Sequence, residues 1–227
     1  MVSKKVIVAL DSNNFNKSLS LVKILKKDVY AFKIGYQFFF NFGLSGYKKI
    51  YSICPKIFLD LKLYDIPNTV QQGIKALSKI KPLFTTVHVS GGDEMMQSTY
   101  INKKKTKILG VSILTSMDSK QSKKYYNQEN ISLLVKKFSN AAKKNSLDGI
   151  VCSPKEIKYI RKRLGKNFII ITPGIRIGST IKNDDQKRVE SPQKAIEMGA
   201  NYLVIGRPIT ESKDPLRVLK EINRKIF

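Results

Sequence analysis

The sequence predicts a single (β/α)8 barrel, the TIM-barrel architecture. Short apolar runs rich in β-branched residues recur eight times along the 227 residues, and amphipathic stretches separate them. Such alternation predicts a parallel sheet covered by helices, and eight repeats in a chain of this length favour a closed barrel. Neither a low-complexity linker nor a shift in composition marks a boundary, so we expect one domain spanning residues 1–227. A doubly wound open sheet is the alternative.

Eight runs are expected to form the strands, in chain order 5–10, 31–35, 56–63, 84–90, 107–114, 148–153, 167–174 and 202–207. The amphipathic stretches between them predict helices over 16–27, 36–50, 68–80, 92–101, 129–145, 154–163, 191–199 and 214–226.

Capping residues support several of these helix starts. Asn68, Ser153 and Ser191 are expected at N-cap positions, and Pro154 and Pro192 stand where first-turn prolines are favoured. The connections 115–128 and 175–190 exceed the usual two to six residues, which indicates functional loops. We interpret the polar stretch 176–188 as a lid that contributes Gln186 to a bound ligand.

The charge balance is strongly basic, with 42 Lys and Arg against 17 Asp and Glu, a net charge of +25. That suggests a nucleic-acid partner, but only seven of the basic residues are Arg and the lysines are scattered along the chain. Zinc-finger spacing and RNA-binding aromatic motifs are both absent from the sequence. We therefore expect no nucleic-acid partner and ascribe the lysine excess to compositional drift.

The apolar runs are all too short to span a bilayer, and the N-terminus lacks the pattern of a secretory signal. Cys54 and Cys152 have no metal-binding spacing, so two inert thiols in a reducing compartment are expected. We therefore predict a cytoplasmic protein without a membrane partner.

Polar residues recur at the predicted carboxyl ends of the strands, where barrel enzymes build their active sites. In strand order they are Asp11, Lys33, Asp60 with Lys62, His88, Thr115, Ser153, Pro173–Gly174 with Arg176, and Gly206 with Arg207. Ser153 is more readily interpreted as a helix cap, and His88 as a hydrogen-bonded residue of the rim.

The stretch FLDLKLYDIPNTV (58–70) places charges in a strand that begins as a buried one. Because strand side chains alternate, Asp60 and Lys62 share one side while the leucines point to the other. Lys33 on the neighbouring strand can reach Asp60, and Asp65 follows the strand end. Opposite charges on either side should keep each group ionised, Lys62 as an ammonium. A purely stabilising ion-pair network is the alternative, although buried pairs stabilise weakly.

Glycine-containing turns at TPGIR (172–176) and IGRP (205–208) predict a phosphate site between the last two strands. Arg207 could hold the phosphate through two parallel hydrogen bonds. At the charged strand, an ammonium between carboxylates can stabilise a carbanion and then protonate it. Metal-ligand clusters, a Schiff-base context and a dinucleotide glycine motif are all absent from the sequence, so we predict chemistry without a metal or cofactor.

The motifs together resemble those of orotidine 5′-phosphate decarboxylase, bacterial branch. DLKLYDIPNTV resembles the family signature D-x-K-x-x-D-I-P-N-T, and further matches are VALD (8–11), FKIG (32–35), TVHVSGG (86–92), GVSILTSMD (110–118), GIVCS (149–153), TPGIR (172–176), DQKR (185–188) and VIGRPIT (204–210). The chain departs from the usual pattern at Tyr64, Val89, Ile177 and Asp184.

The resemblance implies decarboxylation of orotidine 5′-monophosphate to UMP, the last step of de novo pyrimidine synthesis. Lys62 would protonate C6, and Asp60 would lie near the leaving carboxylate. Lys33 would hold Asp60, and it and Asp11 would touch the ribose. A homodimer is implied, because Asp65 and Thr69 would reach into the neighbouring subunit's site. The remaining substrate-binding residues would be Ile66, Thr115, Pro173, Arg176, Gln186, Gly206 and Arg207.

Two other functions are also consistent with the sequence. Related sugar-phosphate enzymes, the 3-keto-gulonate-phosphate decarboxylases and hexulose-phosphate synthases, share D-x-K-x-x-D but use magnesium. A basic, non-enzymatic barrel that binds RNA or DNA is the alternative from another class.

Overall fold

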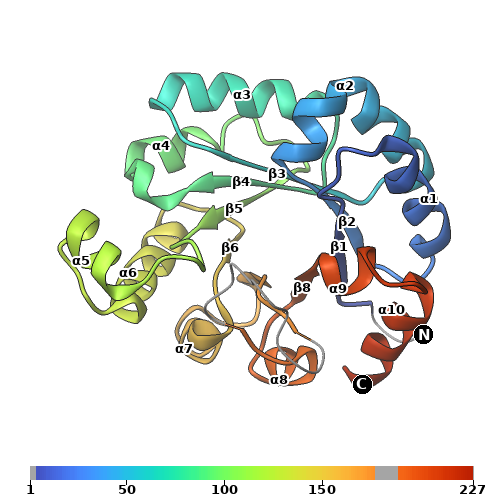
Figure 1. Ribbon diagram of the computed structural model, residues 1–227. Coiled ribbons are helices and arrows are strands. Elements are labelled where there is room, and N and C mark those ends of the chain that lie inside the picture. Colours follow the sequence, from blue (N-terminus) through green and yellow to red (C-terminus); the bar gives the residue numbers. More distant parts are fainter. Residues whose placement is uncertain (1–3, 177–188, 227) are drawn as a thin grey trace.

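Eight parallel strands form a closed barrel with helices around its outside (Figure 1). The computed structural model describes residues 4–176 and 189–226. The strands are β1 (Val6–Ala9), β2 (Ala31–Ile34), β3 (Ile57–Leu63), β4 (Phe84–His88), β5 (Lys107–Val111), β6 (Gly149–Val151), β7 (Ile169–Thr172) and β8 (Tyr202–Ile205). Strand β1 pairs with both β2 and β8, which closes the sheet. The closed order confirms the predicted barrel and excludes the open sheet.

The helices lie between the strands in chain order. They are α1 (Phe15–Leu25), α2 (Tyr36–Ile53), α3 (Pro67–Lys79), α4 (Asp93–Ser98), α5 (Ser119–Tyr126), α6 (Ile131–Lys144), α7 (Ile157–Leu164), α8 (Pro192–Glu197), α9 (Arg207–Thr210) and α10 (Pro215–Lys225), with 3-10 turns η1 (Val89–Gly91) and η2 (Pro154–Glu156).

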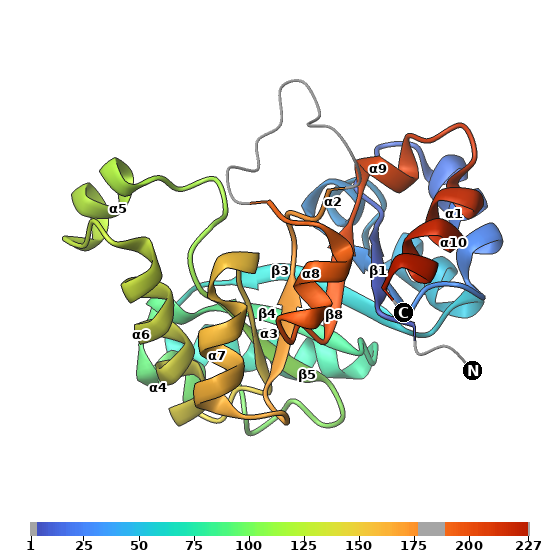
Figure 2. The same cartoon turned by 90° about the horizontal axis from the view of Figure 1, so that it is seen from below.

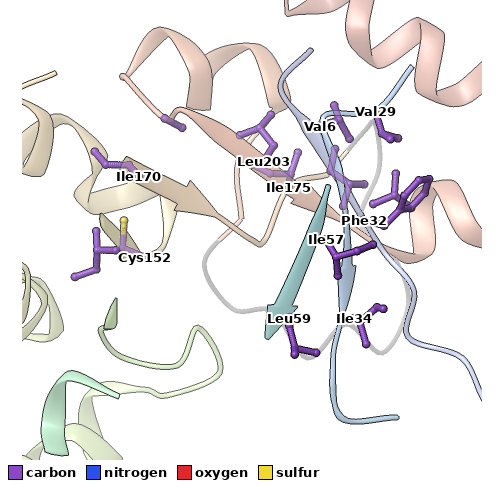
Figure 3. Close-up of a cluster of buried hydrophobic side chains, with 14 of the residues drawn as sticks. Val6, Val29, Phe32, Ile34, Ile57, Leu59, Cys152, Ile170, Ile175 and Leu203 are labelled. Carbon is purple, nitrogen blue, oxygen red and sulfur yellow. The ribbon is translucent and has the colours of Figure 1, made fainter. Parts of the chain in front are cut away.

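Alternation along the strands separates two apolar layers. One buried cluster contains Ile7, Phe58 and Phe84, whose side chains fill the barrel interior. The other contains the alternate strand residues, Val6, Val8, Phe32, Ile34, Ile57 and Leu59 among them, packed between strands and helices (Figure 3). Lys33 and Asp60 each lie two residues beyond an interior position, at Ala31 and Phe58, so they continue the inward face toward the carboxyl end.

Most expected helix starts are correct. The Ser191 hydroxyl accepts a hydrogen bond from the N–H of Lys194 and caps α8, and Pro192 occupies its first turn. Ser153 caps η2 in the same way, accepting from the N–H of Lys155. The N-cap expected at Asn68 is wrong. Helix α3 already begins at Pro67, which has no N–H to satisfy, so Ile66 takes the cap position and Asn68 lies inside the first turn.

The connection 115–128 is not the open loop that its length suggested. It contains α5, whose start is capped by the Asp118 carboxylate accepting from the N–H of Gln121. The sequence of α5 is rich in lysine and tyrosine and has few apolar residues. It therefore lacks the apolar periodicity from which a helix is predicted. Figure 2 shows α5 standing away from the barrel, beyond α6. Helix α9, four residues long, was also not predicted. Within the described residues, the helices are all too short or too polar to cross a bilayer.

Candidate active site

A cavity of about 680 Å³ opens at the carboxyl ends of the strands. Asp11, Lys33, Asp60 and Lys62 line it together with apolar residues of the barrel interior, which include Phe58, Val111, Val151 and Val204. The apolar residues exclude water from the inner wall, so charges above them interact more strongly than they would in solvent. The cavity also contains Thr115, Pro173, Arg176, Gly206 and Arg207, as the sequence predicted.

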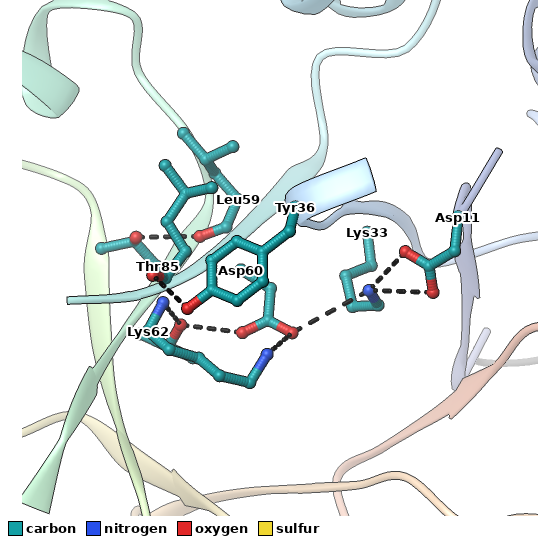
Figure 4. Close-up of polar contacts among 9 residues, drawn as sticks. Asp11, Lys33, Tyr36, Leu59, Asp60, Lys62 and Thr85 are labelled. Carbon is teal, nitrogen blue, oxygen red and sulfur yellow. Dashed lines mark hydrogen bonds and ion pairs between the residues drawn. The ribbon is translucent and has the colours of Figure 1, made fainter. Parts of the chain in front are cut away.

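Four charged side chains form a continuous chain across this cavity (Figure 4). Lys33 Nζ lies 3.0 Å from Asp11 Oδ1 and 3.9 Å from Asp60 Oδ2. Lys62 Nζ lies 2.8 Å from the same Asp60 oxygen. The predicted contact of Lys33 with Asp60, and the shared side of Asp60 and Lys62, are therefore confirmed.

Asp60 is the most enclosed member of this chain, with 8% of its surface exposed. Burial, the largest single effect, raises the pKa of the Asp60 carboxyl. The charges of Lys33 and Lys62, with hydrogen bonds from Lys62 and Thr86, outweigh it and bring the pKa below its usual value. Asp60 is therefore an anion held in a poorly hydrated place by two cations.

Thr86, which was not among the residues predicted from the sequence, touches both central residues. Its hydroxyl donates to Asp60 Oδ1 at 2.8 Å and accepts from the backbone N–H of Lys62 at 2.9 Å. Tyr36 was missed as well: its hydroxyl donates to the Leu61 carbonyl at 3.1 Å, and its ring centre lies 5.5 Å from Lys62 Nζ. Alternation along β4 could have identified Thr86, which shares the inward face with Phe84. Tyr36 follows β2 and left no comparable signal.

His88 ends β4 beside this cluster, and its ring centre lies 5.6 Å from that of Tyr64. Burial, followed by the positive charge of Lys62, lowers the pKa of His88, and the opposing effect of Asp60 is smaller. The neutral imidazole is therefore favoured, and His88 adds no third cation to the cluster.

The predicted phosphate end gathers at the other side of the cavity. Gly206 is the N-cap of α9 and Arg207 is its first residue, while Pro173 and Arg176 follow β7. The start of α9 and two arginines, Arg176 and Arg207, thus border one part of the cavity. Gln186 and most of the expected lid lie outside the described residues.

Three predicted site residues, the catalytic candidate Asp65 and the substrate-binding candidates Ile66 and Thr69, lie away from this cavity. Asp65, Ile66 and Thr69 are exposed on the turn after β3 and the start of α3, and they are absent from the described residues that line the cavity. Asp65 accepts a hydrogen bond from the neighbouring N–H of Ile66 at 2.7 Å. Ser153 is also absent from that lining, and its hydroxyl donates to Glu156, which fits a structural cap.

The arrangement can be compared with known proteins. Residues 4–222 match the model of the orotidine 5′-phosphate decarboxylase / HUMPS family. The chain belongs to this family. Since the match covers nearly the whole barrel, the resemblance inferred from DLKLYDIPNTV is confirmed.

Individual relatives agree with the family match. The chain is 45% identical to orotidine 5′-phosphate decarboxylase of Wigglesworthia glossinidia brevipalpis over 226 residues, which cover 97% of each chain. The crystal structure of orotidine 5′-phosphate decarboxylase from Lactobacillus acidophilus aligns with a TM-score of 0.83 at 35% identity, covering 99% of each chain. An orotidine 5′-monophosphate decarboxylase from Methanocaldococcus jannaschii, complexed with the inhibitor BMP, aligns with a TM-score of 0.79 at 25% identity, covering 98% of each chain.

The charged chain of this barrel differs from a metal centre. Within residues 4–176 and 189–226, clusters of three or more His, Cys, Asp or Glu side chains suited to a metal ion are lacking. Cys54 and Cys152 are both buried, and neither forms a disulfide bond.

Proposed function

We propose that this barrel decarboxylates orotidine 5′-monophosphate to UMP and carbon dioxide in the cytoplasm, without a metal or organic cofactor. One observation carries the proposal: the buried Asp60 carboxylate lies between two ammonium groups, and one of them, Lys62, lies in hydrogen-bond contact with it. Membership of the decarboxylase family and the relatives' names support the choice of substrate.

The reaction breaks the bond between C6 of the pyrimidine and its carboxylate. The electron pair stays on C6, carbon dioxide leaves, and a proton from Lys62 Nζ completes UMP. An ammonium fixed beside the developing carbanion lowers the barrier because it needs no reorganisation as charge forms. Asp60 lies on the side of the leaving carboxylate and disfavours a second negative charge there.

Other residues would hold the parts of the substrate that do not react. Lys33 and Asp11, joined at 3.0 Å, would contact the ribose hydroxyls. Thr115 and Pro173 would border the pyrimidine, and Gly206, Arg207 and Arg176 would hold the phosphate, with Gln186 from the far side. Binding energy from the phosphate would offset the cost of orienting the base against Lys62.

A second copy of the chain would complete the site. Asp65, Ile66 and Thr69 are exposed and lie outside their own cavity, and 66% of the Ile66 surface is open to solvent. In a homodimer this turn would enter the partner's cavity and extend the charged chain with a third carboxylate. Mixing Lys62→Ala with Asp65→Ala protein should then restore activity, because hybrid dimers carry one intact site. If activity does not return after verified subunit exchange, site sharing is wrong.

The decisive assay follows the ultraviolet absorbance of orotidine 5′-monophosphate with purified protein and no added metal. We expect turnover that is unchanged by EDTA. Turnover that depends on magnesium would favour the related sugar-phosphate enzymes. Failure to decarboxylate, together with duplex DNA or RNA binding at moderate salt, would favour the nucleic-acid alternative.

A further inference from the structure

The peptide group between Leu61 and Lys62 lies in an irregular part of strand β3, where the pairing register with β4 shifts. Leu59 pairs with Thr85 and Leu63 pairs with Val87. The chain therefore advances four residues along β3 where it advances only two along β4. Two extra residues are thereby accommodated between the paired positions, as in a β-bulge. The irregularity lies beside the residue proposed as proton donor.

Lys62 adopts a left-handed backbone conformation at this point, with a φ of 45°. A side chain disfavours that region, and lysine has no special tolerance for it. The other non-glycine residues with positive φ, namely Lys81, Lys104, Asn127 and Ser146, lie in turns or at helix ends. Of the described residues, only Lys62 combines this conformation with a position inside a strand.

Two side chains hold this peptide group from its opposite sides. The Leu61 carbonyl accepts from the Tyr36 hydroxyl at 3.1 Å, and the Lys62 N–H donates to Thr86 Oγ1 at 2.9 Å. In a regular strand, neighbouring backbone groups would take both hydrogen bonds. Here the first residue of α2 and an inward residue of β4 take their place.

The hydrogen bonds of Thr86 also determine the direction of its hydroxyl hydrogen. Since Thr86 Oγ1 accepts from the Lys62 N–H, its own hydrogen is directed to Asp60 Oδ1 at 2.8 Å. The other Asp60 oxygen then receives Lys62 Nζ at 2.8 Å. These hydrogen bonds form a closed ring, which runs from the Lys62 N–H through the Thr86 hydroxyl and the Asp60 carboxylate to the Lys62 ammonium.

We propose that Tyr36 and Thr86 are positioning residues, whose hydroxyls clamp the Leu61–Lys62 peptide so that the Lys62 ammonium is aimed at Asp60 and the reacting carbon. The Tyr36 ring, 5.5 Å from Lys62 Nζ, restricts the ammonium from a further side. The inference rests on the proposed function of Lys62 as proton donor. Neither residue needs to touch the substrate.

The test compares two adjacent threonines. Thr86→Val removes the clamp while keeping the shape of the side chain. Thr85→Val is the matched control, since Thr85 is equally buried and donates to the Leu59 carbonyl at 2.8 Å, before the irregularity. We expect Thr86→Val to lower kcat by about 10- to 100-fold with little change in KM, because small misplacements of a reacting group carry such losses. Thr85→Val should keep kcat, even if its melting temperature falls as much.

Further variants test whether a hydroxyl at residue 86 restores kcat and whether Thr86 and Tyr36 act together. Thr86→Ser retains the hydroxyl and should recover most of the lost kcat. Tyr36→Phe should lower kcat by roughly 3- to 10-fold, because it should misplace the same ammonium by a smaller amount. Tyr47→Phe is the control: it loses a hydroxyl that donates to the Ile80 carbonyl, and it should leave kcat unchanged. Because both hydroxyls hold one peptide, the double variant Tyr36→Phe/Thr86→Val should lose less than the product of the two single losses.

The outcomes separate this inference from the proposed function. An inactive wild-type protein would refute the decarboxylase proposal, and the clamp would then be judged from a crystal structure of Thr86→Val. Positive φ at Lys62 and an unchanged Lys62–Asp60 contact in that crystal would overturn the clamp. An active wild type with Thr86→Val within twofold of its kcat, or with Thr85→Val equally impaired, would also overturn it.

Discussion

Lysines surround both ends of this barrel, but their environments differ. At the amino-terminal end, a hollow of about 690 Å³ is lined by five lysines, Lys4, Lys5, Lys26, Lys27 and Lys56, with no carboxylate among its described lining residues. At the carboxyl end, Lys33 and Lys62 are largely enclosed and both contact Asp60. In the described part of the chain, the five lysines of the amino-terminal hollow form no ion pair with a carboxylate.

The comparison separates the cations of the proposed site from the lysine excess. Exposed ammonium groups are hydrated and interact weakly, whereas enclosed groups must be paired and therefore have defined positions. The inward face of β2 and β3 encloses Lys33 and Asp60, and the irregular peptide places Lys62 above them. Pairing and enclosure, and not the number of lysines, distinguish the end with the proposed site.

The largest expected difference between the two ends comes from removing one lysine at each. Lys62→Ala should lower kcat by about 10⁴-fold or more, since it removes both the proposed proton donor and the cation proposed to stabilise the carbanion. Lys56→Ala, at the amino-terminal hollow, should leave kcat unchanged. Steady-state decarboxylation assays on folded variants would measure both. Substantial turnover by Lys62→Ala would refute its role as proton donor.

Carboxylates offer the same comparison. Asp60→Asn should reduce kcat by about 10²- to 10³-fold, the scale expected on removing one preorganised electrostatic group. Asp148→Asn is the control: Asp148 lies before β6, at the amino-terminal end, and accepts from Lys103 Nζ at 2.7 Å. It should alter stability and not kcat. If Asp60→Asn merely destabilises the protein and keeps its kcat, the charged chain is a stabilising network only.

His88, which is enclosed at the carboxyl end of the barrel, should make the stability of the protein depend on pH in the acidic range. Because the pKa of His88 is lowered in the folded protein, the unfolded chain binds more protons between that pKa and the ordinary value of 6.5. The free energy of unfolding should therefore fall as the pH is lowered through this window. Urea unfolding at several pH values would show a shallower decline in His88→Gln. An equal decline in both proteins would contradict the assignment.

The smallest effect is expected from neutralising the amino-terminal lysines. The triple variant Lys4→Gln/Lys26→Gln/Lys27→Gln should keep kcat within twofold, and each exposed substitution should change the free energy of unfolding by at most about 0.5 kcal/mol. Assays at low and moderate salt would check this. A large loss of activity would show that the lysine excess supports catalysis, and the contrast between the two ends would disappear.

Predictions from sequence succeeded where a local pattern carries the information. Alternation placed Asp60 and Lys62 on one side of their strand, and strand ends identified Asp11, Lys33 and Arg207 as cavity residues. They failed where the pattern is weak. Helix α5 has little apolar periodicity, and the proline at residue 67 moved the start of α3 ahead of Asn68.

The order of the eight strands and the side to which Asp60 and Lys62 point follow from the sequence alone, because they depend on spacing along the chain. The pairing of β1 with β8 decided between a closed barrel and an open sheet. The left-handed conformation of Lys62 and the hydrogen bonds of Tyr36 and Thr86 to the Leu61–Lys62 peptide became visible only in the tertiary structure. These features depend on hydrogen bonds between segments about 25 residues apart, and on a change of register between β3 and β4. A local pattern carries no record of such pairings, since the energy that favours them exists only once the strands lie side by side.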